Sequence, residues 1–234
     1  MKSLFKHKKV GYNDLVSADQ KAKRKKLKLD LITCNFIAII ILFTFTPLGF
    51  IHLGFVKLTL LHIPVILASL LLGSKRGTVV ASTFAGLSLI INTLSPSLMS
   101  FAFSPFIPVY GEEHGSILAL FICFIPRLLL GYIPGKFIEI IKFDIDRSRL
   151  RVLAYSIIAL TVTLLHTTMV MLMMLAFFLP AISNLRAIGR EETIWAIALL
   201  CYNNGLPEAL LAGISIPALF IPLKKILDKV VNKI

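Results

Sequence analysis

Six apolar segments constrain this chain more than any other feature of its sequence. A transmembrane helix needs about 20 consecutive apolar residues, and five of these segments reach or approach that length, while the second lies at the short end. Hydrophobic residues make up 57% of the 234 residues, with a mean hydropathy of +0.86, more than a soluble domain needs. The sequence therefore predicts an all-α membrane protein with six transmembrane helices, at residues 29–45, 58–72, 77–94, 115–141, 150–179 and 193–223.

A polar tail precedes the first apolar segment and divides the chain into residues 1–28 and 29–234. The tail holds ten lysine and arginine residues, and it is too long and too polar for an ordinary signal peptide. We interpret it as a cytoplasmic tail held near anionic lipid. Binding of nucleic acid is the weaker alternative, because no basic and aromatic fold motif accompanies the charge. The sequence therefore predicts no nucleic-acid partner.

The basic residues are distributed unevenly between the two sides of the expected bundle. With six spans, one side receives 21 of the 25 lysine and arginine residues and the other receives Lys57, Arg186 and Arg190, while Arg127 lies within a span. Such a difference is typical of the positive-inside rule. We therefore expect both termini in the cytoplasm of a multi-pass cell-membrane protein. The three cysteines lie in apolar segments without metal-ligand spacing, so no metal or cofactor is expected.

Three irregular segments, 46–57, 95–114 and 180–192, are then expected on the outer side. The middle one alternates prolines with aromatic residues, including Phe103 and Tyr110. An aromatic belt at the membrane interface is one interpretation. We favour a lid that closes over a pocket between the spans, because interleaved prolines give an irregular but stiff loop. A basic turn at 73–77 separates the second span from a third that is rich in small residues, which let a neighbouring helix approach closely.

Polar side chains within apolar segments are the best indicators of function in a membrane protein. Arg127 is the clearest, and it suits a substrate carboxylate because its planar group can bond one in a bidentate way. An ion pair between Arg127 and Glu208 is an equally good structural interpretation. Lone histidines such as His62 and His166 are interpreted as packing residues. Further candidates for substrate contact lie at similar depth or near the outer mouth: Asn92, Asn203, Asn204, Glu208, Lys57, Phe103 and Tyr110.

Several catalytic and energy-coupling motifs are absent from the sequence. There is no phosphate-binding loop of the Walker A type, no HExxH and no GxSxG. The spans also contain few acidic residues for an ion-coupled cycle. A membrane-embedded solute-binding protein that uses a partner's energy is therefore favoured over an intramembrane enzyme or a channel-like facilitator.

The chain resembles the substrate-binding S components of energy-coupling factor (ECF) vitamin transporters. The resemblance covers about residues 32–225 and rests on TPLGFIHLGFVKLTLLHIPVILASLLLGSKRG, FAGLSLI, SFAFSPF, FIPRLLLGYIPG and NNGLPEALLAG. SFAFSPF followed by IPRLLLG is most similar to the pantothenate type, while the folate, cobalamin and riboflavin types share much of the remainder. The resemblance implies six helices, an outward-facing cup capped by loops, and no enzymatic activity of the chain itself.

The resemblance also implies partners and roles for individual residues. The expected partners are a transmembrane scaffold subunit and two cytoplasmic ATPase subunits, onto which the S component docks through small residues of its first span. Cys34-xxx-Ala38 is the corresponding pair in this sequence. Pantothenate has one carboxylate, an amide and two hydroxyl groups. Arg127 or Lys57 would hold the carboxylate, and Asn92, Asn203 and Asn204 the remaining groups.

Overall fold

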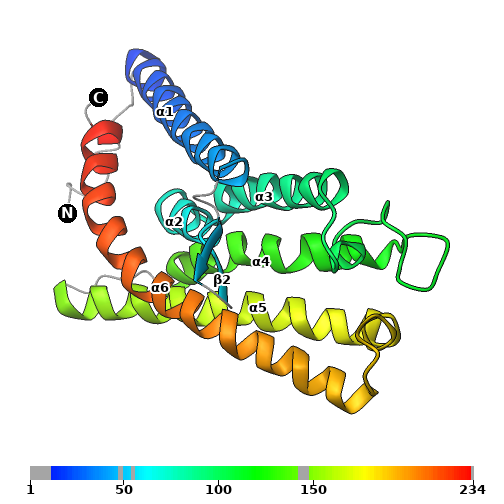
Figure 1. Cartoon of the computed structure of the whole chain (residues 1–234). Helices are drawn as coiled ribbons and strands as arrows, with labels where there is room; N and C mark the ends of the chain where they lie inside the picture. Colours follow the sequence, from blue (N-terminus) through cyan, green and yellow to red (C-terminus); the bar gives the residue numbers. More distant parts are fainter. Residues whose placement is uncertain (1–11, 47–49, 54–55, 142–147, 233–234) are drawn as a thin grey trace, which may run out of the picture.

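The computed structural model describes residues 12–46, 50–53, 56–141 and 148–232. Six α-helices account for most of them, which confirms the predicted all-α class (Figure 1). Five are long and apolar enough to cross a membrane. In chain order the helices are α1 (Tyr12–Thr44), α2 (His62–Leu72), α3 (Ser74–Leu94), α4 (Leu118–Ile141), α5 (Ser148–Arg186) and α6 (Arg190–Asn232).

The expected second span is shorter than the sequence suggested. Helix α2 begins at His62 and has 11 residues, about 17 Å at 1.5 Å per residue, against a hydrocarbon core of about 30 Å. The residues before it form an antiparallel hairpin of β1 (Phe50–Leu53) and β2 (Val56–Thr59), in which Phe50 pairs with Thr59. The prediction of a helix from 58 was therefore wrong, because alternation of apolar residues with His52 and Lys57 suits a strand as well as a helix.

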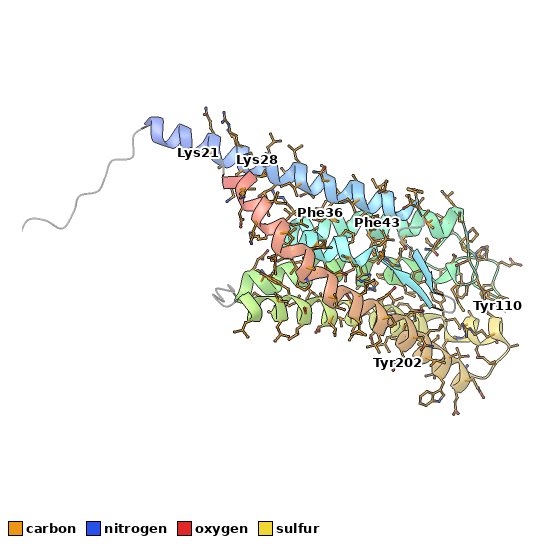
Figure 2. The ribbon with its side chains drawn as sticks, turned by 60° about the vertical axis from the view of Figure 1, so that its left-hand side comes forward. Lys21, Lys28, Phe36, Phe43, Tyr110 and Tyr202 are labelled. Atoms are coloured by element: carbon orange, nitrogen blue, oxygen red, sulfur yellow. The ribbon has the colours of Figure 1, made fainter. Side chains whose placement is uncertain are left out.

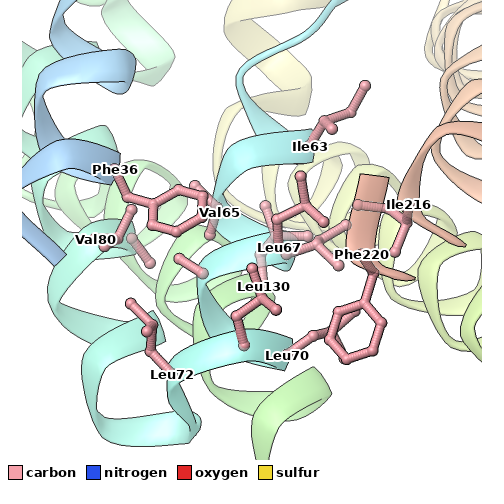
Figure 3. Close-up of a cluster of buried hydrophobic side chains, with 14 of the residues drawn as sticks. Phe36, Ile63, Val65, Leu67, Leu70, Leu72, Val80, Leu130, Ile216 and Phe220 are labelled. Carbon is pink, nitrogen blue, oxygen red and sulfur yellow. The ribbon is translucent and has the colours of Figure 1, made fainter. Parts of the chain in front are cut away.

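Helix α2 lies at the centre of the bundle, and all of its residues are buried. Figure 3 shows its side chains packed between Phe36 of α1, Val80 of α3 and Leu130 of α4, with Ile216 and Phe220 of α6 on the remaining side. A short helix that is apolar on every face can be stable only where neighbours cover every face. This cluster is the main hydrophobic core of the molecule.

Helices α2, α3 and α4 approach one another closely at glycine residues. A Cβ atom on Gly77 would lie 2.3 Å from the carbonyl oxygen of Gly131, and one on Gly135 would lie 2.4 Å from the backbone nitrogen of Ser74. This contact confirms that small residues of the third span admit a neighbouring helix. We name this region, made of Ser69, Gly73–Gly77 and Gly131–Glu139, the glycine joint.

The turn in the glycine joint is shorter than expected. Helix α3 begins at Ser74, so Gly73 alone separates α2 from α3, and Lys75 and Arg76 belong to the first turn of α3. Gly73 has a φ of 88°, a conformation that side chains with a Cβ adopt with strain. Glycine is required at position 73 because a single residue reverses the chain direction there with a positive φ.

Helix α1 extends far beyond the bundle at the end where the glycine joint lies (Figure 2). The described part of the basic tail is helical and continuous with the apolar part, since α1 begins at Tyr12. Two contacts tie this helix to its neighbours: Lys28 Nζ donates to the carbonyl of Val230 at 2.6 Å, and Arg76 donates to Asp30 at 2.8 Å. We name the end of the bundle marked by Lys28, Arg76 and Lys136 the basic end.

Two segments in which the sequence suggested a break in a helix, 180–192 and 203–207, are largely helical instead. Helix α5 bends at Phe178 but continues to Arg186, so only residues 187–189 lack helical structure in the expected loop 180–192. Helix α6 runs without a break through 203–207 despite Pro207. Both predictions were wrong because apolar surroundings favour internal backbone hydrogen bonding even at proline and glycine.

The segment between α3 and α4 packs against the bend in α5. It contains one turn of 3₁₀ helix, η2 (Ser100–Ala102), and the Phe101 ring meets the Phe178 ring edge-on, with centroids 5.6 Å apart. Both rings are buried. Phe101, with Phe103 packed beside it, therefore joins residues of α4, α5 and α6 in a second, smaller core at the end of the bundle away from the glycine joint, whereas Phe106 and Tyr110 are exposed.

Candidate functional site

A cavity of about 340 Å³, with both polar and apolar lining, lies among the helices, on the side of α2 away from the glycine joint. Every helix contributes to its wall or mouth. The residues that line it are Thr44, Leu61, His62, Phe84, Ser88, Ile91, Asn92, Ser95, Ser97, Phe103, Arg127, His166 and Glu208. Four of these side chains can carry charge, although the surrounding helices are apolar.

Arg127 of α4 is held rigidly in the cavity wall. Its Nη1 donates to the carbonyls of Ile122 and Cys123 at 3.0 and 2.9 Å. The rings of Phe84 and Phe103 lie 5.3 and 5.4 Å from the guanidinium carbon, within cation–π distance. The side chain is only 8% exposed, yet Nε is buried without a hydrogen-bond partner within the described part of the chain.

Two histidines and a glutamate face the same cavity from three other helices. His62 begins α2, His166 lies in α5 and Glu208 in α6. Nε2 of His166 is buried and has no partner among the described residues. A buried polar atom without a partner costs about 1–3 kcal/mol, so this ring has capacity for one further hydrogen bond.

Asn92 connects the cavity wall to the segment that follows α3. Its Nδ2 donates to the carbonyl of Ser88 at 2.8 Å, and its Oδ1 accepts from Ser100 Oγ at 2.9 Å. Ser100 Oγ in turn accepts from the backbone nitrogen of Ser97 at 2.8 Å. A neighbouring bond of 2.7 Å joins the hydroxyls of Thr93 and Ser104. The amide of Asn92 thus holds the loop in place, and its second N–H bonds no described residue.

Comparison with known proteins identifies the type of molecule to which this cavity belongs. The family described as "ECF transporter, substrate-specific component" matches residues 36–220. The chain belongs to this family. The match spans all the residues that line the cavity.

One curated relative of this S component is the pantothenic acid transporter PanT of Lactococcus lactis subsp. cremoris (strain MG1363). The two are 47% identical over 79 residues, which are 34% of this chain and 40% of the relative. The chain thus matches about two fifths of the relative's length. Family and relative are transport proteins, which confirms the prediction of a transport component over an enzyme. As an S component, the chain is a multi-pass membrane protein.

The cavity brings together four of the residues that the sequence suggested for substrate contact. These are Arg127, Asn92, Phe103 and Glu208, from α4, α3, the following loop and α6. They are separated by up to 116 residues in sequence, and the folding of α3 against α4 and of α6 against α2 brings them to one place.

The remaining candidates lie elsewhere. Asn203 is exposed on α6, Asn204 is half-buried, and neither lines the cavity. Tyr110 is 48% exposed and lines a different hollow, between its loop and the end of α5. Lys57 belongs to β2, and its side chain is outside the described part of the structure. Cys34 and Ala38 lie one turn apart on an exposed face of α1.

Sequence reasoning gave too little weight to the two histidines and overlooked Phe84. For a lone histidine in an apolar segment, the sequence does not predict whether the side chain points into the bundle or away from it. The available signal was their combination: two histidines, an arginine and a glutamate in otherwise apolar spans are costly unless they face one shared interior.

Proposed function

We propose that this S component binds pantothenate in the cavity around Arg127 and delivers it by docking on a transmembrane scaffold with two ATPase subunits. The observation that carries the proposal is the state of the Arg127 guanidinium. It is buried and held in place, but part of its hydrogen-bonding capacity is unused. A cation in such a position is expected to receive an anionic group of the substrate.

The unused edge of the guanidinium suits a carboxylate. Nη1 is occupied by two carbonyls, whereas neither Nε nor Nη2 donates to a described residue. Nε and Nη2 present two parallel N–H groups on one edge, the arrangement that bonds a carboxylate in a bidentate way. The remaining polar groups, His166 and the second N–H of Asn92, would meet the hydroxyl and amide groups of the substrate.

The size and shape of the cavity favour a small, branched vitamin. About 340 Å³ is at the lower end of the 300–1,000 Å³ that ligand pockets span, which disfavours cobalamin. The rings of Phe84 and Phe103 lie against Arg127 and so do not form an empty slot for the flat rings of folate or riboflavin. The name of the curated relative, a pantothenic acid transporter, supports the same choice.

The distribution of charge supports an orientation with both termini in the cytoplasm. Basic residues of four helices belong to the basic end, on the side of α2 away from the cavity: Lys28, Lys75, Arg76, Lys136 and Lys224. Figure 2 shows Lys28 at this end. Under the positive-inside rule this end is cytoplasmic, and the cavity then faces outward. The exposed pair Cys34 and Ala38 offers a small-xxx-small face on α1 for the scaffold subunit.

Calorimetric titration of the purified chain in detergent tests this proposal. Pantothenate is expected to bind one-to-one, while folate, riboflavin and cobalamin do not bind. Arg127→Ala should weaken pantothenate binding about 100-fold, since it removes two charge-assisted hydrogen bonds. Arg76→Ala, which removes a cation paired with Asp30 at the basic end, is the matched control and should bind as the wild type does. Binding of another vitamin, or unchanged affinity in Arg127→Ala, would contradict the proposal.

A further inference from the structure

We propose that Pro126 is a positioning residue that prepares Arg127 for the ligand by freeing a backbone carbonyl. This inference rests on the proposed function of Arg127 and extends it to the residue beside it. Pro126 lies inside α4 and its ring is fully buried. It does not touch the ligand in this proposal; it acts through the guanidinium.

The freed carbonyl belongs to Ile122. In an α-helix each N–H donates to the carbonyl four residues earlier, and proline has no N–H to donate. The carbonyl four residues before Pro126 is that of Ile122, and it accepts instead from Arg127 Nη1 at 3.0 Å. The same nitrogen also donates to the carbonyl of Cys123 at 2.9 Å. The Ile122 carbonyl, which lacks a donor in the helix, and the Arg127 guanidinium therefore satisfy each other's hydrogen-bonding capacity.

This bond determines which edge of the guanidinium is left for a ligand. With Nη1 directed back along its own helix, and with Phe84 and Phe103 near the group, the edge with Nε and Nη2 is the one that remains. An arginine without this bond would have to be ordered by the ligand itself, at a cost in side-chain entropy. Pre-organisation of this kind increases affinity by reducing the cost of binding.

A second proline in the same helix shows that the arrangement is not a general result of proline. Pro134 is also inside α4 and buried, and the carbonyl that it frees is that of Leu130. Within the described residues, no side chain donates to that carbonyl, and the nearby bond is from the Gly135 nitrogen to Ser69 Oγ at 2.8 Å. Pro134 lies within the glycine joint, whereas Pro126 directly precedes Arg127, which lines the cavity.

The test compares pantothenate with its alcohol analogue, in which a hydroxymethyl group replaces the carboxylate. In Pro126→Ala the new N–H competes for the Ile122 carbonyl, and the preference for the carboxylate over the alcohol should fall about tenfold. Pro126→Val restores the same N–H but keeps three side-chain carbons, so it leaves a smaller void than alanine does. Its preference for the carboxylate should fall by the same amount. Pro134→Ala, the matched control, should keep the wild-type preference. A general loss of folding would instead weaken both ligands equally.

A second measurement is independent of any ligand. The Nε–H proton of Arg127 should exchange with water about tenfold faster in Pro126→Ala than in the wild type. Its NMR resonance can be assigned in ¹⁵N-arginine protein, because it is lost in Arg127→Lys. If the wild type does not bind pantothenate, the proposed function fails and this exchange rate alone decides whether Pro126 positions Arg127. If both Pro126 variants keep the carboxylate preference and the exchange rate of the wild type, the inference is wrong even where Arg127→Ala abolishes binding.

Discussion

The glycine joint and the cavity are two regions where helices of this S component meet through polar groups, and they differ in how those groups are satisfied. In the glycine joint the Glu139 carboxylate accepts from the backbone nitrogen and the hydroxyl of Ser74 at 3.0 and 2.8 Å, and Ser69 Oγ accepts from the Gly135 nitrogen. In the cavity Arg127 Nε and His166 Nε2 are buried without partners among the described residues.

We infer that this difference distinguishes a structural contact, the glycine joint, from the proposed binding site, the cavity. A polar group that is satisfied inside the fold contributes to stability, whereas an unsatisfied one reduces stability until something binds it. Two such atoms in one cavity are a cost that the fold carries in the absence of ligand. Ligand binding should therefore stabilise the protein, and substitutions in the two regions should affect different measurements.

The largest expected effect is on stability, from a substitution in the glycine joint. Gly77→Val would place a side chain 2.3 Å from the Gly131 carbonyl and should lower the free energy of unfolding by about 3 kcal/mol through overpacking. Gly86→Val is the matched control on the same helix, because no atom lies within 4 Å of its Cβ position. Denaturant titration in detergent measures both. Equal stability of the two variants would show that the close approach is not required.

A smaller effect, on ligand affinity alone, is expected at His166. His166→Leu removes a ring nitrogen that has no partner inside the fold, so pantothenate should bind about tenfold more weakly while thermal stability without ligand stays equal or rises. Thr163→Val is the control: Thr163 Oγ1 is also buried without a described partner, but the residue does not line the cavity. A parallel loss of affinity in both variants would contradict a direct contact by His166.

The smallest effect is expected at Asn203, where the sequence alone suggested substrate contact. The side chain is exposed and outside the cavity, so Asn203→Ala should leave pantothenate affinity within about twofold of the wild type, since no contact is lost. Calorimetric titration beside His166→Leu measures the contrast. A loss as large as that of His166→Leu would place the ligand nearer α6 than the cavity indicates.

The helical class and the helices themselves could be predicted from the sequence because their signal is apolar length. The ends of the elements could not. Proline and glycine at 203–207 suggested a break, but α6 continues through them, and the segment before α2 proved to be a hairpin. The local sequence indicates which backbone conformation a residue favours. The apolar surroundings decide whether backbone N–H and C=O groups can remain without hydrogen bonds within the helix.

The site was predictable only in part, for a geometric reason. Arg127 and Glu208 stood out because charged groups in apolar segments need an interior to face. His166 and Asn203 could not be ranked, because a sequence without a known helix rotation does not state which face is inside. Phe84 is an ordinary apolar residue until the ring is found beside the guanidinium.

The shortness of α2 has a consequence for the surroundings of the hairpin. A helix of 11 residues covers only part of the membrane's depth, and the rest on that side is left to the two-stranded hairpin. Each strand of a two-stranded sheet has an outer edge with backbone groups that its partner does not bond, and such edges are not stable against lipid tails. The hairpin must therefore border protein or solvent. Strand β2 lies beside α6, so on that side the hairpin borders protein and its backbone groups are kept away from lipid tails.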